Sequence, residues 1–154
     1  MDDPRWLADE MLGRLARYLR FVGCDTEYAR GEADDRIRAR ALREGRILVT
    51  RDRRLGAATP GAVVLRAVTI ERQWRELRVA CPDLPTSVRF DRCSLCNGRL
   101  RPAASEPGAP PRPGPDGTIV PTFACDRCGH RYWEGSHTAG IRRRIAAWSR
   151  PEAP

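Results

Sequence analysis

Four cysteines arranged as two Cys-x-x-Cys pairs carry the most specific chemical signal in this chain. They are Cys93, Cys96, Cys125 and Cys128. A structural zinc ion takes four tetrahedral ligands, and two residues between paired cysteines allow one tight turn to supply two thiolates. Turn residues follow each pair, so backbone N–H groups are free to point at the sulfurs. The spacing therefore predicts a zinc ribbon whose closed Zn²⁺ shell stabilises the fold and does no chemistry itself.

Other interpretations of these thiols stay open at this point. Two local disulfides or a redox-active dithiol would use the same four residues, and His130 could replace one thiolate. The 28 residues between the pairs exceed the usual spacing of about 15–20. The proline-rich segment 101–117 accounts for the excess, because longer loops cost little entropy. Cys24 and Cys81 lack such partners and are expected to be small buried residues.

Three separated acidic positions in the first half predict a second, catalytic metal site. Asp9 follows a short apolar strand, Asp52 follows another, and the doublet Asp34-Asp35 opens a helix. In a parallel sheet the carboxyl ends of the strands meet at one edge, so these side chains are expected there. Carboxylates brought together repel one another unless a cation lies among them, and Mg²⁺ or Mn²⁺ prefers such oxygen ligands. The alternatives are a plain turn acid for Asp52, a helix N-cap for Asp34 and a solvated acid in the first helical turn for Asp35.

Strands and helices alternate through the first half of the chain. Strands are predicted at Arg5–Ala8, Cys24–Tyr28, Ile47–Thr50 and Ala62–Leu65. Between and after them, apolar residues at helical spacing predict helices over Glu10–Val22, from Asp34 or Asp35 to Gly45, and from Thr69 onward. This alternation predicts an α/β fold with a parallel sheet and right-handed crossovers.

The pattern changes after residue 85, which predicts two domains, 1–85 and 88–154. The second contains the thiol pairs, a strand over Thr118–Ala124 and a last helix with Ile141, Ile145 and Trp148 on one face. Between the pairs, segment 101–117 is so rich in proline that a helix or a central strand is excluded. We expect a disordered insert there.

Positive charge is carried by arginine alone. The net charge is +8 and the chain contains 28 arginines and no lysine. A polyanionic partner is favoured, whereas P-loop nucleotide hydrolysis and pyridoxal chemistry, which need lysine, are excluded. Arg14, Arg17 and Arg51 flank the acidic positions, and their guanidinium groups could bind substrate phosphates. A role as solvated or salt-bridged surface residues is the alternative.

Nothing in the sequence indicates a membrane. No apolar run approaches the roughly 20 residues that cross a bilayer, and the amino terminus lacks the features of a secretory signal. The expected localisation is therefore the cytoplasm, where thiols stay reduced and are available as metal ligands.

Several long motifs are similar to those of the Mut-seven C-terminal RNase domain family. In the first half the resemblance covers Leu7–Arg20 and Glu44–Asp52. In the second half it covers Arg92–Gly98, Cys125–Gly129 and Tyr132–His137. Together these motifs extend over nearly the whole chain apart from the proline-rich insert and the two termini.

The resemblance implies a PIN-like nuclease domain, with a parallel sheet between two layers of helices, joined to a zinc ribbon. It implies a metal-dependent RNase whose Asp9, Asp34 and Asp52 hold one or two Mg²⁺ or Mn²⁺ ions, and whose products bear 5′-phosphate and 3′-hydroxyl ends. The doublet leaves the choice between Asp34 and Asp35 open.

The alternative function is a non-catalytic RNA- or ribosome-binding adaptor that uses the ribbon and the arginines. Three spaced carboxylates count against it, because acids oppose phosphate binding unless a cation is present. RNA is the expected partner in both cases. A toxin nuclease would also need an antitoxin, and whether an antitoxin or a ribosomal component binds is unknown from one sequence.

Overall fold

A parallel sheet of four strands forms the centre of the computed structural model, which describes residues 3–104 and 111–153. Side by side the strands are β2 (Thr26–Ala29), β1 (Trp6–Asp9), β3 (Ile47–Thr50) and β4 (Val63–Val64). All three pairings are parallel, so the chain returns through a helix after each strand. The predicted α/β fold with a parallel sheet is confirmed.

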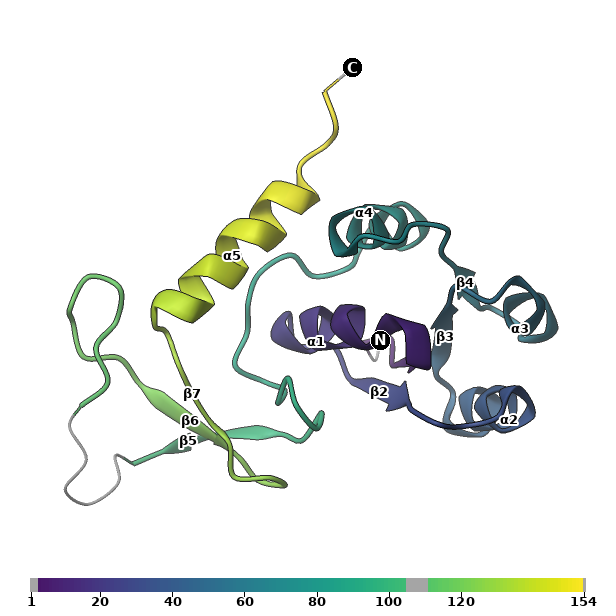
Figure 1. The fold of residues 1–154 in the computed structure, drawn as a ribbon. Helices are drawn as coiled ribbons and strands as arrows, with labels where there is room; N and C mark the ends of the chain where they lie inside the picture. Colours follow the sequence, from purple (N-terminus) through teal and green to yellow (C-terminus); the bar gives the residue numbers. More distant parts are fainter. Residues whose placement is uncertain (1–2, 105–110, 154) are drawn as a thin grey trace.

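Helices cover both faces of this sheet (Figure 1). On one face lie α1 (Gly13–Phe21), which follows the short 3₁₀ turn η1 (Glu10–Leu12), and α4 (Ile70–Ala80). On the other lie α2 (Asp34–Glu44) and α3 (Arg53–Ala58). Alternation along β1 explains the two cores, because Trp6 and Ala8 pack with α1 and α4 while Leu7 packs with α2 and α3.

The last helix, α5 (Ser136–Ser149), packs onto the face that carries α1 and α4. Ile141 and Ile145 are buried in that core, as the helical spacing predicted. The Trp74 indole N–H donates to the Ser149 hydroxyl at 3.0 Å. By packing, α5 therefore belongs with the α/β layers, although it follows the thiol pairs in sequence. The division into 1–85 and 88–154 stays a prediction.

The second sheet is antiparallel and small. It consists of β5 (Leu100–Ala103), β6 (Thr122–Cys125) and β7 (Arg131–Trp133), in that order. The prediction of disorder over 101–117 needs correction, because Arg101–Ala103 lies in β5 and Pro113 forms a bridge with Ile119. Proline is tolerated in β5 because it is an edge strand, where a missing N–H need not break a ladder. Residues 105–110 lie outside the described residues.

Helix ends agree with the expected signals at two positions and differ at one, and one helix was not expected. Thr69 precedes the first residue of α4, and Gly45 ends α2 in the left-handed conformation with φ 60°. Helix α3, however, was not predicted. The cap of α2 is Ala33, which makes no side-chain bond, so neither acid of the doublet caps the helix as the alternative interpretation expected. Within the described ranges, no helix has the length and apolar character needed to span a bilayer.

Candidate functional site

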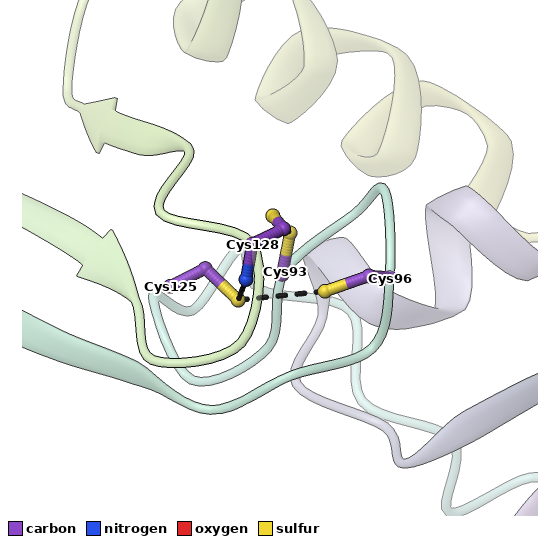
Figure 2. A group of neighbouring side chains, drawn as sticks. All are labelled: Cys93, Cys96, Cys125 and Cys128. Carbon is purple, nitrogen blue, oxygen red and sulfur yellow. Dashed lines mark hydrogen bonds between the residues drawn. The ribbon is translucent and has the colours of Figure 1, made fainter.

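The four thiols converge at the base of the antiparallel sheet (Figure 2). All four Sγ atoms lie within 4.8 Å of one another. The distance is 3.6 Å between Cys93 and Cys128 and 3.4 Å between Cys96 and Cys125. Four thiolates about 2.3 Å from a tetrahedral zinc would lie roughly 3.8 Å apart. The donor set and its spacing therefore fit a structural zinc ion, and all six cysteines of the chain are free thiols.

The electrostatics of the cluster also favour a cation. Burial opposes ionisation of Cys125, but the backbone N–H groups of Cys128 and Arg127 point at its sulfur and lower its pKa to about 7. Burial is the main cause that raises the pKa of Cys96 to about 12. Neighbouring thiolates repel one another, so all four ionise together only when a cation lies among them.

Aromatic residues of the ribbon support the cluster from the side. The Tyr132 hydroxyl lies 3.1 Å from the Cys93 sulfur and accepts a hydrogen bond from the Ser94 N–H at 3.1 Å. The His130 ring stands edge-on to Tyr132, with centroids 4.8 Å apart, and His130 is not one of the clustered ligands. The guanidinium of Arg112 lies 4.3 Å from the centre of the Trp133 ring. Tyr132 therefore positions the thiol turn.

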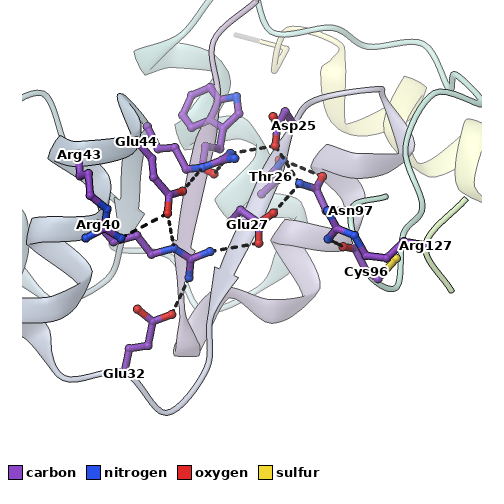
Figure 3. A network of polar contacts seen from close by, with 12 residues as sticks. Asp25, Thr26, Glu27, Glu32, Arg40, Arg43, Glu44, Cys96, Asn97 and Arg127 are labelled. Carbon is purple, nitrogen blue, oxygen red and sulfur yellow. Dashed lines mark hydrogen bonds and ion pairs between the residues drawn. The ribbon is translucent and has the colours of Figure 1, made fainter. Parts of the chain in front are cut away.

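The first thiol turn is fixed onto the edge strand β2 by two side chains. Buried Arg20 donates to the carbonyls of Thr26 at 2.8 Å and Ser94 at 3.1 Å. The Asn97 amide accepts from the Thr26 N–H at 3.0 Å and donates to Asp25 at 2.8 Å (Figure 3). The ribbon thus covers backbone that an edge strand otherwise leaves unpaired. Sequence reasoning missed both roles, because these partners are more than 65 residues apart.

Asp9 is the last residue of β1 and is almost fully buried. One carboxylate oxygen accepts from the Met11 N–H at 3.0 Å. The other accepts from the Thr50 hydroxyl and from the Arg51 N–H at 3.3 Å. Its neighbours therefore orient the carboxylate and leave a free lone-pair site on the oxygen that accepts from Met11.

Asp52 lies at the same sheet edge and is joined to Asp9 through one residue. Its N–H donates to the Thr50 hydroxyl at 2.9 Å, and that hydroxyl donates in turn to Asp9. One Asp52 oxygen accepts from the N–H groups of Arg54 and Leu55 and so caps α3. Sequence reasoning missed Thr50, whose only signal is its place at the carboxyl end of an apolar strand.

Asp34 and Asp35 are exposed in the first turn of α2, after β2. Among residues 3–104 and 111–153, only the four cysteines form a group of three or more ligating side chains close enough to share an ion. The structure therefore brings Asp9 and Asp52 to one sheet edge and does not gather Asp9, Asp34 and Asp52 into a second such group.

Comparison with known families matches residues 4–145, nearly the whole chain, to the family described as the Mut7-C RNAse domain. The chain belongs to the Mut7-C RNAse domain family. Membership in it points to a nuclease function with RNA as substrate. Searches of curated proteins and of solved structures gave no match.

The three arginines expected to bind substrate come from two segments of this Mut7-C domain. Arg14 and Arg17 are exposed on α1, and Arg51 is half-buried directly after β3. The Arg51 side-chain Nε is buried and has no hydrogen-bond partner among the described residues. Because this Nε is closed to solvent, an anionic ligand would bind the guanidinium through its terminal N–H groups.

Proposed function

We propose that this protein is a metal-dependent ribonuclease that hydrolyses phosphodiester bonds of RNA at the Asp9 edge of the parallel sheet. The observation that supports it most is the buried Asp9 carboxylate, oriented by three hydrogen bonds and joined through Thr50 to Asp52. A buried acid costs stability unless something compensates it. Asp9 stands at a strand end in a Mut7-C RNAse domain, and a catalytic role would explain why a destabilising buried acid is kept there.

Asp9, Asp34 and Asp52 would hold Mg²⁺ or Mn²⁺, with Asp35 as the alternative to Asp34. Carboxylate oxygens suit both ions, and the Asp52 oxygen that does not cap α3 has no hydrogen bond within the described part of the chain. The Asp34 side chain is exposed and would move toward the edge when the ion binds. A bound ion lowers the pKa of water and offsets negative charge on the phosphate.

Side chains of the protein would orient the metal-binding carboxylates and the RNA. The Thr50 hydroxyl holds Asp9 in one orientation, and the cap on α3 holds Asp52. The Arg51 guanidinium would bind a phosphate oxygen beside the scissile bond, and Arg14 and Arg17 would bind phosphates further along the strand. The zinc ribbon would be structural and would assist RNA binding.

Replacement of Asp9 tests the proposal. Asp9→Asn keeps the shape and an acceptor oxygen but removes the charge, so Mn²⁺-dependent cleavage of labelled RNA oligonucleotides should fall at least 100-fold. The matched control is Asp83→Asn, an exposed acid outside the edge, which should cleave as the wild type does. Comparing Asp34→Asn with Asp35→Asn identifies the third ligand.

Folding of the Asp9→Asn variant is checked separately by its zinc content and thermal unfolding. Full metal-dependent cleavage by a folded Asp9→Asn variant would refute the assignment of Asp9. A wild-type protein that binds these oligonucleotides but never cleaves them with Mg²⁺ or Mn²⁺ would instead be the RNA-binding adaptor.

A further inference from the structure

A groove runs between α1, α5 and the ribbon, and its wall includes Ser94 and Leu95 of the first thiol turn. It consists of two adjoining cavities of about 280 Å³ and 160 Å³. Both are lined by Arg17, Phe21, His137 and Ile141. These four shared residues define what we call the α1–α5 groove. In Figure 1 α5 begins directly after β7, and the lining residues show that α1 contributes to the same hollow.

The groove is lined by positive charge and no negative charge. Arg14, Arg17 and Arg144 line the smaller cavity, and both histidines of the chain line one or both cavities. Neither cavity has an aspartate or glutamate in its wall. Guanidinium groups gathered without acids repel one another, and an anion that bridges them removes that cost.

The arginines are free to take a ligand. Arg14 and Arg17 make no hydrogen bond or ion pair with any described residue, and Arg144 only contacts the Tyr18 hydroxyl at 3.4 Å. Arg40, on the opposite side of the sheet, differs because it is paired with three glutamates. The guanidinium groups of Arg14 and Arg17 are therefore available to an anion in the groove.

The larger cavity is lined by apolar side chains as well as by charged ones. Phe21 and Tyr132 line it, together with Leu95, which is 52% exposed although it is a leucine. Bases bind on such surfaces by stacking and apolar contact. A cavity of about 280 Å³ holds one base with its sugar and excludes a duplex, whose recognition instead spans a broad surface.

We propose that the α1–α5 groove binds single-stranded RNA, with phosphates against Arg14, Arg17 and Arg144 and one base in the larger cavity. This rests on the proposed function in taking RNA as the substrate. From Asp9 to Arg17 the chain rises by roughly 13 Å through the 3₁₀ turn and the start of α1. A stacked strand advances about 3.4 Å per nucleotide, so the groove holds nucleotides some three or four positions from the scissile bond.

Binding without cleavage provides the test. The zinc-loaded full chain is titrated against a fluorescein-labelled oligouridine of about 15 nucleotides, without added Mg²⁺ or Mn²⁺, and anisotropy is measured. The double variant Arg17→Ala/Arg144→Ala should bind at least tenfold more weakly. Its salt dependence, as log K against log salt concentration, should be shallower by about 1.4, for two lost phosphate contacts. A duplex RNA of the same length should compete at least tenfold less well than the single strand.

The matched control is Arg38→Ala/Arg72→Ala, which removes the same charge from two exposed arginines outside the groove. It should bind within twofold of wild type. If both double variants bind equally, or if the duplex competes as well as the single strand, the groove proposal is wrong. If the groove variant loses binding while wild type never cleaves RNA with Mn²⁺, the groove stands and the nuclease proposal fails. If cleavage is metal-dependent while the groove variant binds as the control does, the nuclease proposal stands and the groove proposal fails.

Discussion

Asn97 offers the sharpest test of how the ribbon is held on the parallel sheet. It is 1% exposed, has φ 67°, and its amide contacts Thr26, Asp25 and Glu27 at 3.0, 2.8 and 3.1 Å. Asn97→Gly removes all three bonds but keeps the left-handed backbone. The Thr26 N–H is fully buried and becomes unpaired, which costs about 1–3 kcal/mol. When the loss of the two partly exposed bonds to Asp25 and Glu27 is added, we expect the free energy of unfolding to fall by about 2–4 kcal/mol.

Two further substitutions separate the contribution of the left-handed backbone from that of the side-chain amide. Asn97→Ala should lose about 1 kcal/mol more than Asn97→Gly, because a β-carbon disfavours the left-handed conformation. Asn97→Asp keeps an acceptor for the Thr26 N–H but turns a carboxylate toward Asp25 and Glu27. Unit charges about 4 Å apart near a surface repel by about 4 kcal/mol before neighbouring arginines offset part of it. That variant should therefore be less stable than Asn97→Gly.

Urea unfolding of zinc-loaded protein, followed by tryptophan fluorescence at neutral pH, measures these differences. Each kcal/mol also corresponds to a shift of about 2–4 °C in Tm for a chain of this size. Leu95→Ala, in the same turn but exposed, is the control and should stay within about 0.5 kcal/mol of wild type. Zinc content is measured for each variant, so that loss of the ion is not mistaken for loss of docking. Wild-type stability in Asn97→Gly, or in Asn97→Asp, would refute the reasoning.

The remaining predictions concern the zinc site and the packing of α3 against β4. Cys93→Ser should lose stoichiometric zinc in metal analysis and unfold the ribbon, because three thiolates no longer close the shell; retained zinc would contradict a four-thiolate site. Gly56→Ala should lose about 1–3 kcal/mol in thermal or urea unfolding, since the added Cβ would lie 2.2 Å from a Val64 methyl carbon. Ala57→Ser, at the exposed neighbouring position, is its control and should change little.

Much of the α/β half could be predicted because its signals are local. The continuous apolar run Ile47–Thr50 is a strand at the bounds expected, and Thr69 and Gly45 mark helix ends through capping chemistry. Helix α3 was missed because it has only six residues and its cap, Asp52, was already assigned to the metal site. One carboxylate oxygen can cap a helix while the other stays available, so the two roles do not exclude each other.

The thiol site could be predicted from spacing, but its place on the molecule could not. Four cysteines in two pairs specify their own partners, and the sulfurs meet as expected. The contacts of Arg20 and Asn97 depend on a turn and a strand that lie about 70 residues apart. Nothing in the local pattern of α1 distinguishes buried Arg20 from exposed Arg17, since both lie off its apolar stripe.

Helix α1 connects the proposed catalytic edge to the zinc site. It starts a few residues after Asp9, its exposed side carries Arg14 and Arg17, and its buried Arg20 bonds to the carbonyl of Ser94 in the thiol turn. That turn also supplies Leu95 to the α1–α5 groove. Because α1 carries the groove arginines and also contacts the thiol turn, loss of zinc would disturb the groove as well as the ribbon. This physical continuity gives a reason for the family match to extend over both halves, residues 4–145, instead of ending with the parallel sheet.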